Sequence, residues 1–343
     1  MPSRPVLLCG SIPLADTDAV LDTVSDTLGH DLARVPDGET GARTNWIAWQ
    51  GPVFARQAAL EPTAERERSY QLRPPLTFKP SATPDDLDFR PLGFADAALA
   101  SYRRFAERRD AGAFRADARF QVCLPTPYAP VYSFVAYDSQ EAVYPVYEAV
   151  MLGELADIAA AIPARDLAIQ WDVATEMSLF ERVFPTPLTD PDRTLIDRMS
   201  RLGDAVPDGA ELGYHLCYGS MNDRHWKEPR DLGRLVWTSN ALARAVSRRI
   251  DWIHVPVPIE RDDDAYFAPL DDLAVAPETE FYLGLVHHED GVEGARRRIA
   301  AALPHRSDFG IAAECGFGRM ADHLIAPLLR LHAEVIKEIE QAV

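Results

Sequence analysis

Eight short apolar runs, each about as long as a β-strand, alternate with segments of helical periodicity along the sequence. Alternation of this kind is typical of βαβ units and therefore of a parallel sheet. The number of runs favours a closed (β/α)8 TIM barrel, an α/β fold, over an open sheet. The runs span residues 6–11, 32–36, 119–124, 167–172, 212–217, 252–257, 281–286 and 309–315.

The segments between these runs carry signals for helix starts. Asp138-Ser-Gln-Glu141 has the pattern of a capping box, and Asp190-Pro191 places a capping aspartate before a first-turn proline. Together with the spacing of apolar residues, these signals predict helices over residues 16–29, 94–109, 138–162, 190–206, 231–248, 291–303 and 320–342.

The interval from Gly38 to Ala118 breaks the regular alternation, because it is long, rich in proline and has a helical pattern only near its end. We interpret it as an insertion after the second strand that covers the barrel mouth, with apolar walls available from Trp46, Trp49, Tyr70 and Phe78. No linker rich in Gly, Ser and Pro divides the sequence. We therefore expect one barrel domain over residues 1–343.

Charge and hydropathy exclude two classes of partner. The chain has 35 Lys and Arg residues against 53 Asp and Glu residues, a formal net charge of -18 at pH 7, and no basic cluster that would follow a phosphate backbone. No apolar run is long enough to span a membrane, and the apolar stretch near the start is too short for a signal peptide. We expect a cytoplasmic protein that binds neither nucleic acid nor membrane.

The polar residues that close the predicted strands are the first candidates for a site, because barrel active sites lie at the carboxyl ends of the strands. His215 and Cys217 stand two residues apart in one run, so their side chains share a face, and both are good zinc ligands. Cys315 closes the eighth run and offers a third ligand across the barrel mouth. The competing interpretation is a buried cysteine beside a hydrogen-bonded histidine. Cys9 and Cys123 lie inside their runs, and we expect them to pack as small hydrophobic residues.

Several short motifs occur in the order and strand positions of a known family. The chain resembles the C-terminal catalytic barrel of cobalamin-independent methionine synthase, over nearly its whole length. The motifs that carry this resemblance are Cys9-Gly-Ser-Ile-Pro13, Asp37-Gly-Glu-Thr-Gly-Ala-Arg43, Leu72-Arg-Pro-Pro-Leu76, Ile169-Gln-Trp-Asp172, His215-Leu-Cys-Tyr218 and Glu314-Cys-Gly316.

The resemblance implies a (β/α)8 barrel that holds one Zn²⁺ ion, which activates a thiol for alkyl transfer. The positions that match the zinc ligands of the family are His215, Cys217 and Cys315. The positions that match its contacts to the carboxylate and ammonium groups of an amino acid are Ser11, Glu39 and Asp172.

The sequence departs from the pattern of the family at several positions, two of which concern the metal and the proton donor. Pro256 stands where the family has a glutamate as its fourth ligand, and proline cannot bind zinc. A shift of four residues brings Glu260 into this role, with His254 or water as competing candidates. A family histidine that donates a proton to the leaving group is matched loosely by His287, our catalytic candidate, or by its neighbour His288.

The function that follows from the resemblance is a zinc-dependent methyl or alkyl transferase acting on a small thiol such as homocysteine. Because the resemblance covers the catalytic barrel alone, we expect no N-terminal folate-binding half. The donor should then be a small alkylated molecule instead of a folate with a polyglutamate tail. Two alternatives stay open: a lyase or decarboxylase on the same barrel, as in uroporphyrinogen decarboxylase, and a non-catalytic protein that binds zinc or a thiol ligand.

Overall fold

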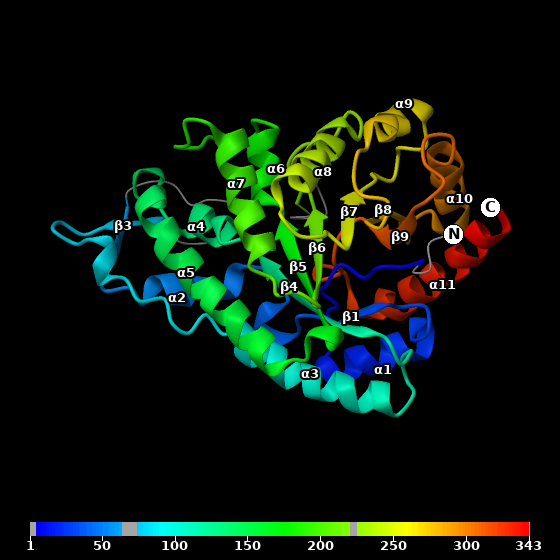
Figure 1. Ribbon diagram of the computed structural model, residues 1–343, viewed down its shortest axis with the longest axis horizontal. Helices are drawn as coiled ribbons and strands as arrows, with labels where there is room; N and C mark the ends of the chain where they lie inside the picture. Colours follow the sequence, from blue (N-terminus) through cyan, green and yellow to red (C-terminus); the bar gives the residue numbers. More distant parts are fainter. Residues whose placement is uncertain (1–4, 64–73, 220–224, 343) are drawn as a thin grey trace.

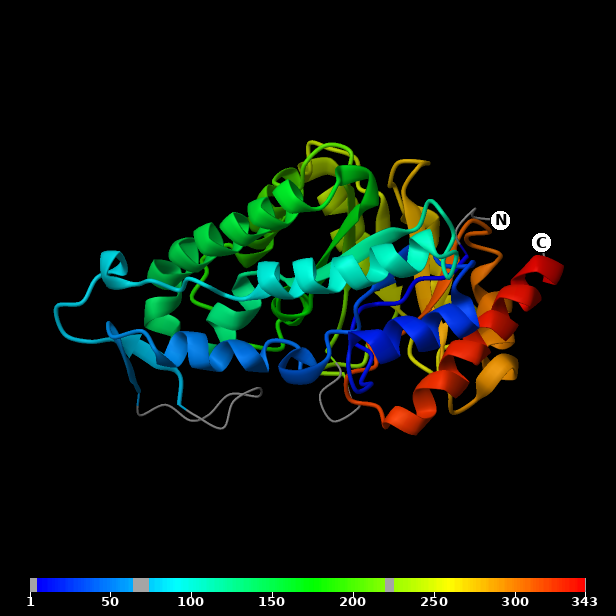
Figure 2. The same ribbon diagram turned by 90° about the horizontal axis from the view of Figure 1, so that it is seen from below.

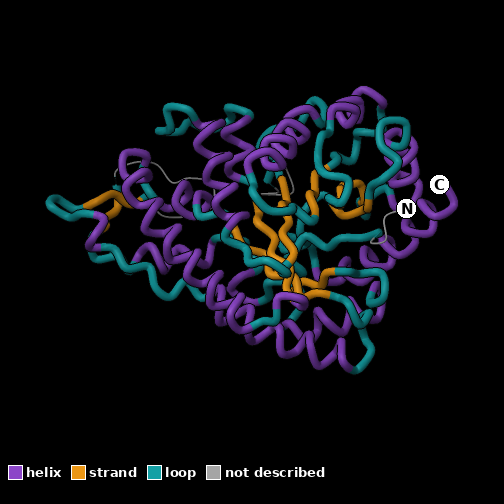
Figure 3. Tube along the Cα trace, viewed as in Figure 1, coloured by secondary structure: helices purple, strands orange, loops and turns teal. Residues whose placement is uncertain are grey.

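A curled sheet of seven parallel strands lies at the centre of the molecule (Figure 3). The computed structural model describes residues 5–63, 74–219 and 225–342. The strands follow the order β1-β4-β5-β6-β7-β8-β9 in the sheet, so each new strand is added beside its predecessor. Their bounds are β1 (Arg34–Pro36), β4 (Arg119–Pro125), β5 (Leu167–Val173), β6 (Glu211–Leu216), β7 (Trp252–Pro256), β8 (Glu280–Val286) and β9 (Gly310–Ala313).

Helices surround this sheet and cover its outer face (Figures 1 and 2). The helices of the described residues are α1 (Thr17–Leu28), α2 (Gly51–Ala55), α3 (Phe94–Asp110), α4 (Tyr128–Phe134), α5 (Tyr137–Ala161), α6 (Thr175–Phe180), α7 (Pro191–Asp204), α8 (Gly233–Ala245), α9 (Asp264–Phe267), α10 (Gly291–Ala302) and α11 (Ile325–Ala342). Short 3-10 helices span Gly41–Arg43, Ala48–Gln50, Pro84–Asp86, Ala164–Asp166, Ala268–Asp272 and Asp322–Leu324.

The first predicted strand, residues 6–11, forms isolated bridges instead of a ladder. Val6 pairs with Leu32 on one side and with Ile311 on the other, and the Ile311 carbonyl also accepts a 3.0 Å hydrogen bond from the backbone of Leu7. The segment therefore lies between the two edges of the sheet. Gly10 interrupts its extended path with a φ of 131°. The structure thus confirms a curled, TIM-like α/β fold, but with seven regular strands where the sequence predicted eight.

Two apolar layers hold the fold together. The larger one fills the space between the sheet and its helices, as expected for helices that pack on a parallel sheet. The smaller one lies inside the curled sheet and consists of Leu7, Cys9, Ala168, Trp252, Tyr282 and Ala312. This inner layer forms the floor beneath the carboxyl ends of the strands, where the candidate site lies.

The segment between β1 and β4 is more regular than the predicted insertion from Gly38 to Ala118. Its last part forms α3, which connects two adjacent parallel strands as a crossover helix does. Its middle part forms α2 and a separate antiparallel pair, β2 (Leu60–Pro62) and β3 (Leu76–Phe78), away from the main sheet in both views (Figures 1 and 2). The structure does not confirm an insertion with the predicted bounds.

Most of the predicted helices are confirmed, but only one of the two predicted N-terminal capping signals is. Asp190 caps α7 by accepting a hydrogen bond from the backbone of Arg193, as predicted. The prediction of a capping box at Asp138 is wrong. The N-cap of α5 is Ala136, and the carboxylate of Asp138 accepts a 3.0 Å hydrogen bond from the hydroxyl of Ser139. None of the helices in the described part of the chain is both long enough and apolar enough to cross a membrane.

Candidate functional site

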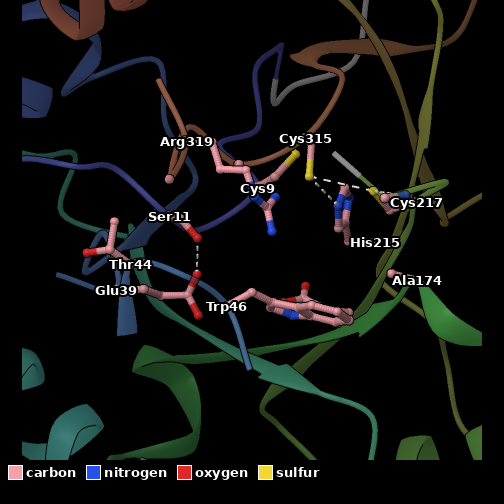
Figure 4. Close-up of a pocket in the computed structure, with 14 residues that line it drawn as sticks. Cys9, Ser11, Glu39, Thr44, Trp46, Ala174, His215, Cys217, Cys315 and Arg319 are labelled. Atoms are coloured by element: carbon pink, nitrogen blue, oxygen red, sulfur yellow. Dashed lines mark hydrogen bonds between the residues drawn. The ribbon is translucent and has the colours of Figure 1, made fainter. Parts of the chain in front are cut away.

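A small pocket of about 50 Å³ opens at the carboxyl ends of the strands, above the inner apolar layer (Figure 4). Loops after β1 and β9 and the ends of β5 and β6 supply its walls. It is lined by Cys9, Ser11, Glu39, Thr44, Trp46, Asp172, Ala174, His215, Cys217, Gly219, Cys315, Gly316, Gly318 and Arg319. Six of the residues singled out in the sequence therefore meet here: Ser11, Glu39, Asp172, His215, Cys217 and Cys315.

Two thiols and an imidazole form a tight cluster on one wall of this pocket. The Sγ atom of Cys315 lies 3.6 Å from Sγ of Cys217 and 3.6 Å from Nε2 of His215, as the dashed lines in Figure 4 mark. Ligand atoms around a tetrahedral zinc ion stand roughly 3.6–3.8 Å apart, given Zn–S bonds of about 2.3 Å and Zn–N bonds of about 2.0 Å. The two 3.6 Å distances match this spacing, and all three ligand atoms lie within 4.8 Å of one another, so the three residues fit a zinc ion.

The turn after Cys217 places a backbone hydrogen-bond donor on its sulfur. The backbone N–H of Gly219 donates a 3.2 Å hydrogen bond to the Cys217 sulfur, and Gly219 has a φ of 78°. Such a turn suits glycine, because other residues rarely adopt a positive φ. The contact with the Cys315 sulfur and burial both raise the pKa of the Cys217 thiol. A metal ion would reverse this effect, since a coordinated thiol loses its proton.

A second histidine stands behind the cluster. His254 on β7 is the register neighbour of His215 on β6, and their Nδ1 atoms lie 2.7 Å apart. Cys9 lies close to both rings, so that these three residues form a second group with spacing suited to a metal ion. The prediction that Cys9 packs as a small hydrophobic residue holds for its burial, but its thiol also lines the pocket.

Two buried carboxyl groups face the cluster across the pocket. Burial and the nearby charge of Asp172 raise the pKa of Glu39 to about 8, although a hydrogen bond from the Ser11 hydroxyl opposes the shift. Burial raises the pKa of Asp172 to about 7, against the effects of His215 and of a 2.9 Å hydrogen bond from Gln170. A cation bound between these groups would offset the free-energy cost of burying their negative charges.

The turn after β1 directs Glu39 into the pocket. Gly38 has a φ of 80° and Glu39 a φ of 48°, so two successive residues adopt the left-handed region. A Cβ atom at Gly38 would lie 2.6 Å from the Val20 side chain, which excludes larger residues. Asp37 anchors the turn: it accepts a 2.9 Å hydrogen bond from the backbone N–H of Glu39 and forms a 2.7 Å ion pair with Arg43. A strained backbone held in this way is typical of functional sites.

Trp46 and Arg319 are among the pocket residues that the sequence did not single out as members of the site. Trp46, which the sequence offered only as a wall of the insertion, donates a hydrogen bond to Asp172, and its ring lies across the pocket from Cys315 in Figure 4. Arg319 extends toward the pocket from the loop after β9. Of the other predicted wall residues, Trp49 packs against Phe94 and Tyr70 lies outside the described residues.

The remaining predicted residues lie in a neighbouring, larger cavity of about 520 Å³. This cavity shares Cys315 and Arg319 with the smaller pocket, and its lining includes Glu260, His287 and His288. Glu260 is exposed and belongs to neither metal-binding group found among the described residues. His287 donates a hydrogen bond from Nε2 to the carbonyl of Val257 at 2.8 Å, and burial lowers its pKa.

A curled parallel sheet with thiols, an imidazole and carboxyl groups at its strand ends defines an α/β chain of the TIM-barrel type with a candidate active site. Solved structures with this fold include a B12-independent methionine synthase from Shewanella sp. W3-18-1 in complex with selenomethionine. It is 14% identical, and the match covers 99% of this chain and 98% of that one, with a TM-score of 0.61.

Two further structures agree with this result. One is a candidate vitamin-B12-independent methionine synthase from Listeria monocytogenes, 15% identical over 97% of this chain and 96% of that one, with a TM-score of 0.56. The other is a methyltransferase from Methanosarcina mazei, 12% identical over 99% and 95% of the two chains, with a TM-score of 0.51. No protein-family model and no curated protein matches the sequence. The likeness confirms the resemblance seen in the motifs, at the level of the fold.

Proposed function

We propose that this chain is a zinc-dependent transferase that moves a methyl or alkyl group onto the thiol of a small amino acid such as homocysteine. The observation that carries the proposal is the cluster of His215, Cys217 and Cys315, whose ligand atoms are spaced for one tetrahedral zinc ion. It stands beside a pocket with groups for both charges of an amino acid. The structural neighbours named as methionine synthases and as a methyltransferase support the same reaction class.

The substrate thiol would complete the coordination of the metal. Zinc bound by His215, Cys217 and Cys315 would lower the pKa of this thiol and so supply a thiolate at neutral pH. Glu260, the fourth ligand proposed from the sequence, would have to approach from the larger cavity, since its side chain is exposed. A position left for the substrate is typical of catalytic zinc sites.

The other walls of the pocket would hold the amino-acid part of the substrate. Ionised Glu39 and Asp172 would accept hydrogen bonds from its ammonium group, while the hydrogen bond from the Ser11 hydroxyl would hold the Glu39 carboxylate in place. Arg319 offers a positive charge for its carboxylate. The Trp46 ring, which lies across the pocket from Cys315, would limit the entry of water.

The transfer itself is a displacement at carbon. The acceptor sulfur, already deprotonated, forms a bond to the alkyl carbon while the bond from this carbon to the donor heteroatom breaks, and the donor fragment leaves with the electron pair. Because the Nε2–H of His287 is engaged with a carbonyl and its pKa is lowered, this residue favours donors whose leaving group needs no proton. A sulfonium donor meets this condition, since it leaves as a neutral thioether.

Metal analysis and a transfer assay test the proposal. We expect about one zinc per chain by elemental analysis, and formation of methionine from homocysteine and a small methyl sulfonium compound. Cys315→Ser should lose both zinc and activity. Cys123→Ser, which alters a buried cysteine outside the cluster, is the matched control and should keep both.

Two outcomes would contradict the proposal. Fully active protein without bound metal would exclude the zinc-dependent reaction. Protein with one zinc ion that transfers no alkyl group to any small thiol would instead be the non-catalytic zinc protein that the sequence left open.

A further inference from the structure

His254 has a hydrogen-bond partner at each of its two ring nitrogens, and these partners are of different kinds. Its Nε2 atom lies 3.0 Å from the carbonyl oxygen of Ala313, and its Nδ1 atom lies 2.7 Å from Nδ1 of His215. The His254 side chain is completely buried, and His215 is nearly so. Both contacts therefore form without competition from solvent.

The carbonyl of Ala313 determines where each proton lies. A carbonyl oxygen can only accept, so Nε2 of His254 must carry a proton. A neutral imidazole has one N–H group, which leaves Nδ1 of His254 as an acceptor. The proton in the 2.7 Å contact then belongs to His215, on its own Nδ1 atom. The Nε2 atom of His215 then carries a lone pair instead of a proton, and this lone pair faces the Cys315 sulfur at 3.6 Å.

A positively charged His254 would carry a proton on Nδ1 as well as on Nε2, so it would donate to His215 instead of accepting. The surroundings of His254 oppose that charge. No carboxylate in residues 5–63, 74–219 or 225–342 forms a hydrogen bond with its ring; the other neighbouring ionisable side chain in its group is the Cys9 thiol. Burying an unpaired charge carries a large free-energy cost in a folded protein. The neutral form is therefore the one that the geometry supports.

The fold also reserves space for this arrangement. Gly284 on β8 lies against His254, and a Cβ atom at this position would come within 2.8 Å of His254 Nε2 and 2.9 Å of the Ala313 carbonyl. Ala313 lies next to the shift in register between β8 and β9. Any larger residue at position 284 would push the ring away from the carbonyl.

We infer that His254 is a positioning residue that holds His215 in the tautomer with its proton on Nδ1, so that Nε2 is the atom that binds the metal. The inference rests on the metal site of the proposed function. It assigns His254 to the support of a ligand, instead of to the fourth coordination position for which the sequence made it a candidate. Interactions of this kind orient metal-binding histidines, and their loss typically weakens metal binding about 10- to 100-fold.

Substitutions at position 254 test the role by zinc affinity, measured in competition with a chromophoric chelator. His254→Leu removes the acceptor while filling the space, and should weaken zinc binding about 10- to 100-fold. His254→Asn keeps an acceptor oxygen near the position of Nδ1 and should retain most of the affinity. His332→Leu is the matched control, because His332 is an equally buried histidine on α11 that bonds only to its own helix through Nδ1.

Nitrogen-15 NMR of the histidine rings gives a second readout that needs no variant. In the wild-type protein, with and without zinc, we expect the proton of His215 on Nδ1 and that of His254 on Nε2. A His215 ring protonated on Nε2, or a His254→Leu variant with zinc affinity within twofold of the wild type, would overturn the inference. If the wild type binds no zinc, the proposed function fails, while the spectrum of the metal-free protein still decides the tautomer.

Discussion

Glu39 and Asp172 are buried carboxyl groups in one small pocket, and burial raises the pKa of Glu39 to about 8 and that of Asp172 to about 7. At neutral pH the pocket therefore holds protons that an ammonium group would displace. Ionised carboxylates accept hydrogen bonds from an ammonium group, whereas protonated ones do so weakly.

Methionine binding should follow this ionisation. We expect the affinity for methionine, measured by calorimetry, to increase as the pH rises from 6 to 8. Asp172→Asn should weaken binding by roughly 1.5–3 kcal/mol, the contribution of a hydrogen bond to a charged group, and leave the zinc content unchanged. The desamino analogue of methionine serves as the control: if it binds as well as methionine at every pH, the carboxyl pair has only a structural role.

The same two groups should make the ligand-free protein less stable at higher pH. Each keeps its proton in the folded state at pH values where the unfolded chain has lost it, so stability falls as the pH rises from about 4 to about 8. Glu39→Gln removes one of these protons. The wild type loses stability at this position as the pH rises, and the variant does not. The free energy of unfolding of the variant, relative to that of the wild type, should therefore increase by up to about 1.4 kcal/mol per pH unit across this range.

Urea unfolding at pH 5 and pH 8 measures this difference. Glu334→Gln, an exposed change on the outer helix α11, provides the control and should follow the wild type at both values. A Glu39→Gln variant whose stability also runs parallel to that of the wild type would show that Glu39 is already ionised at pH 5.

At the level of strands, the amino ends of the sheet are joined by an ion cluster opposite the site. Arg34 of β1 is buried and pairs with Glu211 of β6 at 2.6 Å and with Glu280 of β8 at 2.8 Å. Its guanidinium also lies over the Trp252 ring of β7, 4.1 Å from the ring centroid. One side chain of β1 thus contacts β6, β7 and β8, none of which is its neighbour in the sheet.

Arg34→Leu should destabilise the fold by about 3–5 kcal/mol, because it removes the buried cation that both Glu211 and Glu280 contact. Thermal or urea unfolding measures the loss. Arg90→Leu, which breaks an exposed ion pair with Asp88, is the matched control and should unfold at the wild-type midpoint. Equal midpoints for the two variants would mean that water reaches the Arg34 cluster and compensates its charges.

The pairing of strands explains why the sequence predicted one part of the site and missed another. His215 and Cys217 lie two residues apart in one run, so their common face follows from strand geometry alone. The contact between His215 and His254 depends on the register of β6 against β7, which neither run encodes by itself. Trp46 and Arg319 reach the pocket from loops, where no periodicity indicates direction.

The same distinction applies to the fold. Local apolar patterns predicted the extended runs and the helices between them, because burial on a parallel sheet requires such patterns. They also predicted residues 6–11 as a full strand. A pattern indicates an extended chain, but it does not reveal that this segment forms isolated bridges instead of a ladder, with Gly10 at a φ of 131°.

For the whole molecule, charge selects among donors. The chain has a net charge of -18, and the larger cavity beside Cys315 is lined by Glu228, Glu260, Glu289 and Glu314, with Arg319 at its border with the small pocket. The three consecutive arginines at positions 296–298 lie on the outer helix α10 and form ion pairs there. A polyanionic donor would thus meet repulsion, whereas a small cation would be attracted.

We therefore expect poor use of 5-methyltetrahydrofolate triglutamate and better use of a small sulfonium donor. Parallel assays with homocysteine and each donor, at low and at high salt, measure both kcat/KM values. Salt should weaken the preference for the cation, because it screens the field of the protein. Methionine formed from the folate donor at a kcat/KM of about 10⁴ M⁻¹s⁻¹ or more would refute this expectation.

The pairing of Val6 with both Leu32 and Ile311 has a consequence for folding of the chain during its synthesis on the ribosome. At about 5–20 residues per second, synthesis of the roughly 300 residues between Val6 and Ile311 takes some 15 to 60 s. During this time Val6 can pair with Leu32 but not with Ile311, which has not yet been made. The inner apolar layer that includes Leu7 lacks Ala312 for the same reason. The nascent chain must therefore shelter an unfinished interior until translation is nearly complete, which makes it a natural client for chaperones that act during synthesis.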